Sequence, residues 1–119
     1  AVLVFVAMPG GATAHPPDEP DQSTVSGEIV DLCCYLSAGA TGTGRAPSAK
    51  QCAKNGQPIG LLAQDGTLYV LYAHRVDIAP FELAKKLAGE NVTLTGVVSQ
   101  RGSINGLEVR RVSRTPARR

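Results

Sequence analysis

Aromatic residues are scarce in this sequence. It contains no tryptophan, three tyrosines and two phenylalanines in 119 residues, and its formal net charge is only +2. Proteins that bind single-stranded nucleic acid use exposed aromatic side chains for base stacking and a basic groove for the phosphates. The composition therefore argues against nucleic acid as a partner.

Signatures of catalysis are also missing. The chain has no G-x-S-x-G motif, no phosphate loop and no paired-carboxylate motif. Its three cysteines, Cys33, Cys34 and Cys52, lack the C-x-x-C spacing that is typical of thiol redox centres and of zinc sites. These absences predict a protein that is not an enzyme.

The first residues, AVLVFVAMPGGATA, carry a different signal. A short apolar run ends in Pro-Gly-Gly and is followed by Ala-Thr-Ala, which resembles the core and cleavage site of a secretory signal peptide. A buried first strand is the alternative. The run is too short to span a bilayer as a permanent helix. We therefore expect residues 1–14 to be a signal-peptide remnant and the protein to be periplasmic or secreted, with no transmembrane anchor.

Composition divides the remaining chain into three parts. Residues 15–22 are rich in proline and acid, which predicts a disordered leader. Residues 23–113 form one predicted domain of about 90 residues. In so small a domain a single disulfide would contribute a large share of the stability. Residues 114–119 are expected to be a basic tail, either solvated or in contact with an anionic surface. The arginines near this end are Arg110, Arg111, Arg114, Arg118 and Arg119.

Residue patterns within the domain predict five strands and one helix. Alternating or β-branched apolar residues indicate strands near 25–32, 59–63, 67–73, 91–100 and 107–112. Asp65-Gly66 predicts a hairpin between the second and third strands. Pro80 and Gly89 bracket a short amphipathic helix. Gly27 and Gly96 suggest bends or bulges.

This order predicts a mainly β fold, an OB-fold-like five-stranded Greek-key barrel with its helix between strands three and four. A small open α+β sandwich is the alternative. A cysteine-bearing insertion follows the first strand, with a short helical turn expected from Pro47 through Cys52.

Four segments, GEIVDLCCYL, CAKNGQPIGLL, GTLYVLY and LAGENVTLTGVV, resemble a group of small secreted bacterial OB-fold-like proteins. The group shares a GxVxDxxCY motif and a cysteine ahead of GxPxGLL, and the resemblance spans residues 26–112. It implies the barrel fold and an exported location. Many members carry a further histidine and cysteine in a pattern like H-x-x-C-A-x-x-C, whereas this chain has Ser48 in place of that cysteine and no histidine just before it. This departure weakens any metal site transferred from the group.

The three thiols allow two hypotheses. A disulfide from Cys33 or Cys34 to Cys52 would close a loop of about 18 residues and stabilise the fold by roughly 3 kcal/mol. Neighbouring residues on a strand point to opposite faces, so only one of the pair should reach Cys52. The resemblance favours Cys34, which occupies its CY position. Alternatively, Cys33, Cys34, Cys52 and His74 bind copper or zinc, for which thiolate and imidazole are suitable ligands.

Three further residues are candidates for a ligand surface: Asp31, Tyr35 and Tyr69. Asp31 lies beside the thiols, where capping of loop amides is the simpler interpretation, and Tyr69 is either a stacking platform or part of the core. The sequence thus predicts a secreted, monomeric, non-enzymatic binding or envelope-accessory module. It would need no cofactor, and its partner would be a small ligand or an envelope protein. A periplasmic copper- or zinc-binding protein is the alternative.

Overall fold

A computed structural model describes residues 20–116. The predicted signal peptide, most of the predicted leader and the last three residues lie outside the described residues. The elements are β1 (Ser23–Asp31), α1 (Leu32–Ala38), a 3-10 turn η1 (Thr43–Arg45), α2 (Ala46–Lys54), β2 (Ile59–Ala63), β3 (Leu68–Ala73), α3 (Ala79–Lys86), β4 (Asn91–Arg101) and β5 (Ile104–Arg114). Within this range, no helix is long and apolar enough to cross a membrane.

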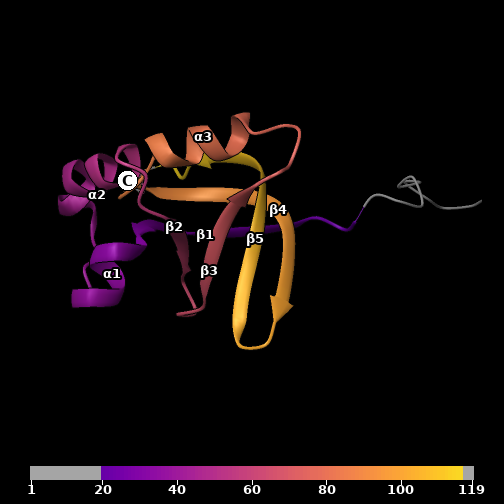
Figure 1. The fold of residues 1–119 in the computed structure, drawn as a ribbon, viewed down its shortest axis with the longest axis horizontal. Helices are drawn as coiled ribbons and strands as arrows, with labels where there is room; N and C mark the ends of the chain where they lie inside the picture. Colours follow the sequence, from indigo (N-terminus) through magenta and orange to yellow (C-terminus); the bar gives the residue numbers. More distant parts are fainter. Residues whose placement is uncertain (1–19, 117–119) are drawn as a thin grey trace, which may run out of the picture.

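The strands form a closed barrel in the order β1-β2-β3-β5-β4 (Figure 1). Neighbouring strands are antiparallel except β3 and β5, which are parallel. The helix α3 lies between β3 and β4 in the sequence. The predicted OB-fold-like barrel is therefore confirmed, including the position of its helix.

Two glycines allow the long strands to bend around this small barrel. At Gly27, β1 pairs with both Ala63 of β2 and Val92 of β4, and a Cβ atom here would collide with the Leu62 carbonyl. At Gly96 the register of β4 shifts against β5, and a Cβ atom would collide with the Glu108 carbonyl. The glycines predicted to mark bends thus lie where the backbones approach most closely.

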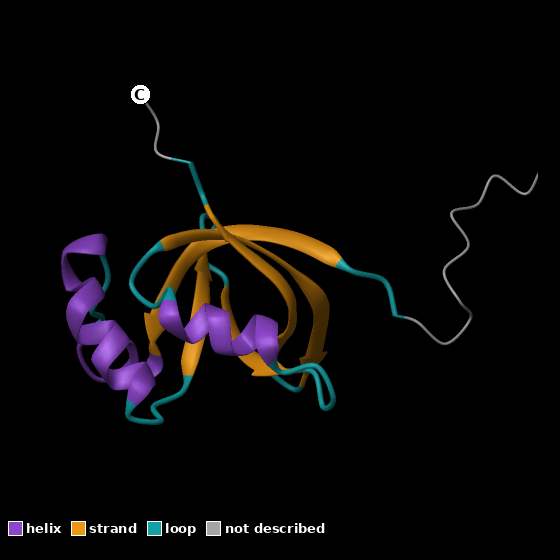
Figure 2. Ribbon diagram, turned by 90° about the horizontal axis from the view of Figure 1, so that it is seen from above, coloured by secondary structure: helices purple, strands orange, loops and turns teal. Residues whose placement is uncertain are grey.

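Alternate residues of every strand face one core. Its largest fully buried side chains include Ile29, Leu61, Leu94 and Leu107. Helix α3 lies against the barrel, with the α1–α2 pair beside it (Figure 2), and Leu87, just after α3, joins the core. Apolar burial of this kind supplies most of the free energy that stabilises a small domain.

Two boundaries differ from the sequence prediction. The first strand ends at Asp31, and Leu32 begins α1, so placing the two adjacent cysteines on a strand was wrong. The last strand continues to Arg114, so the predicted basic tail begins inside β5. In the first case the Asp31 side chain accepts from backbone three residues away, and in the second the Arg114 side chain pairs with the distant Glu90; periodicity reveals neither contact.

Candidate functional site

The thiols lie at the start of α1, and Asp31 is the reason that a helix begins there. Its carboxylate Oδ1 accepts a hydrogen bond from the Cys34 backbone N–H at 2.8 Å, which caps the helix. Leu32 N–H donates to the Pro58 carbonyl at 2.9 Å, which ties the same turn to the chain entering β2. Gly39, with φ of 66°, ends the helix. Asp31 is 6% exposed, so its structural role is to position the first turn of α1.

Cys34 and Cys52 lie 4.4 Å apart and are not bonded. The Asp31 carboxylate and the thiols of Cys33 and Cys34 also gather, with their ligand atoms within 4.8 Å of one another. Cys33 is exposed, whereas Cys34 and Cys52 are half-buried. Cys34 thus lies near each of the other two cysteines, but Cys52 is not part of the group formed by Asp31, Cys33 and Cys34.

This environment disfavours the thiolate of Cys34. The hydrogen bond with Asp31 raises the pKa of the Cys34 thiol, and partial burial and the nearby charges of Asp31, Cys52 and Cys33 raise it further. A thiolate is the form that attacks disulfides and binds metals. The surroundings of Cys34 therefore make its thiol harder to ionise than an ordinary cysteine thiol.

Helix α2 carries Cys52, and the predicted helical turn through this residue is confirmed as a longer helix. Pro47 lies in its first turn, where its missing N–H does no harm. Ala49 and Ala53 pack into the barrel core. Their small side chains allow α2 to pack closely against the barrel. This packing fixes the position of Cys52, which lies between them in the sequence.

The other predicted site residues are placed elsewhere. His74 Nδ1 accepts hydrogen bonds from the backbone N–H groups of Val76 and Asp77 at 3.2 and 3.0 Å, and it does not belong to the cluster around the thiols. Tyr69 packs against the core, so it is not an open stacking platform. Tyr35 is half-buried on α1.

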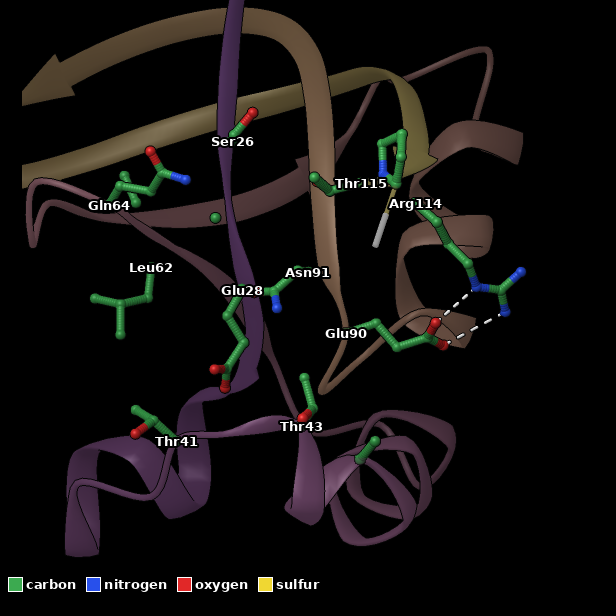
Figure 3. A pocket seen from close by; sticks show the side chains of 14 residues that line it. Ser26, Glu28, Thr41, Thr43, Leu62, Gln64, Glu90, Asn91, Arg114 and Thr115 are labelled. Carbon is green, nitrogen blue, oxygen red and sulfur yellow. Dashed lines mark hydrogen bonds and ion pairs between the residues drawn. The ribbon is translucent and has the colours of Figure 1, made fainter. Parts of the chain in front are cut away.

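A cleft of about 780 Å³ lies between the insertion and the barrel (Figure 3), and its described lining contains none of the predicted site residues. One wall comes from the segment 41–46 that joins α1 to α2. The opposite wall comes from residues 26–28 of β1 and 62–64 at the end of β2, and residues 90–91 and 114–116 close one side. Hydroxyl, amide and charged side chains share the lining with apolar groups such as Leu62, Ala63 and Pro116.

Glu90 anchors the closed side of this cleft. Its carboxylate accepts from Lys50 Nζ at 2.7 Å and from Arg114 Nε at 2.6 Å, and the Arg114 pair is visible in Figure 3. Hydrogen bonds from Arg114 and then Lys50 lower the pKa of Glu90 to about 2. Glu90 therefore links α2, the start of β4 and the end of β5, and Arg114 belongs to this network rather than to a free tail.

Glu28 holds the opposite wall. Both of its carboxylate oxygens lie 2.9 Å from the Gly42 backbone nitrogen. Gly42 has φ of 103°, a conformation that favours glycine. The alternation of β1 already placed Glu28 opposite the buried Ile29, but no pattern in the sequence indicates that the chain returns to meet it.

No protein-family model, curated protein or solved structure matches this chain. The resemblance described above therefore stays a prediction.

Proposed function

We propose that this chain is an exported, non-enzymatic binding module in which the α1–α2 insertion forms one wall of a ligand cleft. A disulfide between Cys34 of α1 and Cys52 of α2 would be a staple that joins the two helices that carry this wall. The observation that carries the proposal is the 4.4 Å separation of the two cysteines, which flank the cleft-lining segment 41–46. A disulfide needs a sulfur–sulfur distance of about 2.05 Å, so a local adjustment would close it.

The glycine content of the insertion explains why a disulfide would stabilise it. Between α1 and α2 the chain contains Gly39, Gly42 and Gly44, and glycine loses more conformational freedom on folding than any other residue. A bridge that closes a loop of about 18 residues restricts the unfolded chain and contributes roughly 3 kcal/mol. The signal-like residues 1–14 support export to a compartment where such a bridge persists.

A second candidate function is copper or zinc binding, favoured by the convergence of the Asp31, Cys33 and Cys34 ligand atoms within 4.8 Å. Cys52, beside Cys34, would be the fourth ligand in place of the predicted His74. Thiolates and a carboxylate suit zinc, and thiolates suit Cu(I). Metal binding would have to displace the proton of Cys34 and share the Asp31 carboxylate with the helix cap.

One experiment separates the two functions. The mature protein is purified from the exporting compartment, alkylated without reduction and weighed intact, and its metal content is measured. One alkylated thiol and no metal support the staple. Three alkylated thiols with one metal ion per chain support the metal site and overturn the staple. Three alkylated thiols without metal overturn both. Alkylation after reduction, which should modify all three cysteines, is the control.

A further inference from the structure

Glu28 differs from the other glutamates that the structure describes. Within residues 20–116 it is the one glutamate without a Lys, Arg or His partner within 4.0 Å. The other three are paired as follows: Glu82 with Lys85, Glu90 with Lys50 and Arg114, and Glu108 with Arg110. A half-buried carboxylate that lines a cleft without a cation is energetically poorer than a paired one. Its charge is therefore available to a ligand.

The contact with Gly42 leaves most of the Glu28 carboxylate free. An ionised carboxylate offers about four acceptor positions, and the single Gly42 N–H is shared between the two oxygens. Glu28 lines the cleft, and its carboxylate lies between Thr41 and Thr43 of the insertion (Figure 3). The unused acceptor positions are thus within a site that a small molecule can enter.

Most of the polar side chains that line the cleft with Glu28 can accept hydrogen bonds. The hydroxyls of Thr41 and Thr43 and the amide of Asn91 line the same cleft as Glu28. Of the lining residues that the structure describes, the one cationic side chain, Arg114, is bonded to Glu90. No aromatic residue is among the described residues of the lining, so the aromatic cage that binds quaternary ammonium groups is not present there. A primary ammonium, with three N–H donors, fits this environment.

We propose that the cleft binds a polar molecule through a primary ammonium group, which pairs with Glu28 and donates to the adjacent hydroxyl and amide oxygens. A polyamine and an amino sugar both supply this group, and the test below distinguishes them. This inference rests on the proposed function, because it names the ligand class of the same cleft.

The test is a titration of the full, oxidised chain followed by NMR at the backbone amides of Gly42, Thr43 and Gln64. The probes are spermidine, glucosamine and glucose, of which glucose has the hydroxyls of glucosamine without its ammonium. We expect saturable shifts with spermidine or glucosamine and none with glucose. Whichever of the two binds more tightly identifies the carrier of the ammonium group.

Two matched variants locate the binding. Glu28→Gln removes the charge but keeps an oxygen that accepts from Gly42, and it should weaken binding at least tenfold. Glu82→Gln removes a carboxylate from α3, outside the lining, and should leave binding unchanged.

An equal loss of binding affinity in both variants would indicate a general effect of net charge. It would overturn the proposal that Glu28 binds the ammonium group. Glucose binding as strongly as glucosamine in the wild-type chain would overturn the ammonium proposal while leaving the cleft as a binding site. No shift with any probe would overturn the ammonium proposal and remove support for the cleft itself.

Discussion

The barrel and the α1–α2 insertion are held by different kinds of interaction. The barrel combines continuous strand pairing with a core of fully buried branched side chains. The α1–α2 insertion is held by the two small core residues of α2, Ala49 and Ala53, and by individual polar contacts, such as Glu28 with Gly42 and Lys50 with Glu90. Local opening therefore requires far less free energy in the insertion than in the barrel. The cleft thus joins a barrel wall that carries Glu28 to an insertion wall whose position is more easily changed.

The largest expected effect comes from the barrel core. Leu61 is fully buried, whereas Leu36 of α1 is 72% exposed. Leu61→Ala leaves a cavity and should lower the free energy of unfolding by about 2–5 kcal/mol. The same substitution at Leu36 should change it by less than about 0.5 kcal/mol. Chemical denaturation of both variants measures their free energies of unfolding. An equal decrease in both would contradict the claim that the barrel core contributes more stability than α1.

Oxidation should have the next largest effect. If Cys34 and Cys52 form the staple, reduction should lower the free energy of unfolding by roughly 3 kcal/mol. Cys34→Ser should abolish this difference between oxidised and reduced protein, whereas Cys33→Ser should preserve it. Denaturation with and without reductant provides the measurement. Loss of the difference in Cys33→Ser, with its retention in Cys34→Ser, would show that Cys33 forms the bridge instead.

A smaller effect is expected at the start of α1. Asp31→Ala removes the cap on Cys34 and should destabilise the protein by about 1 kcal/mol. Asp31→Asn keeps a capping oxygen but removes the carboxylate that raises the pKa of Cys34. In the reduced protein, the Asp31→Asn substitution should therefore lower this pKa and speed alkylation of Cys34 at pH 8. An unchanged rate would show that Asp31 does not control the thiol.

The smallest effect concerns the ion pairs of Glu90. Because its pKa falls from 4.5 to about 2 on folding, the unfolded chain binds more protons than the folded chain between these values. The stabilisation is complete above pH 4.5 and is lost as the pH approaches 2. Glu90→Gln should reduce stability at pH 7 by at most about 1 kcal/mol, and the difference from wild type should vanish near pH 2. If the difference in the free energy of unfolding between wild type and Glu90→Gln stayed constant from pH 7 to pH 2, the lowered pKa of Glu90 would be contradicted.

The sequence predicted the barrel well and the site incompletely, for physical reasons. Strand alternation, the Asp65-Gly66 turn and the Pro80 helix start are local signals, and all agree with the structure. The change from β1 to α1 depends on one Asp31 hydrogen bond, which no periodicity encodes. The cleft depends on contacts between residues distant in sequence, such as Glu28 with Gly42 and Glu90 with Arg114.

If a Cys34–Cys52 disulfide controls the wall of the cleft, as we propose, the Gly42 amide reports on it directly. This N–H donates to the Glu28 carboxylate, so its hydrogen-exchange rate measures how often the wall opens. We predict that exchange at Gly42 is at least roughly tenfold slower in the oxidised protein than in the reduced protein. An equal rate in both states, with the disulfide confirmed by mass, would contradict the account.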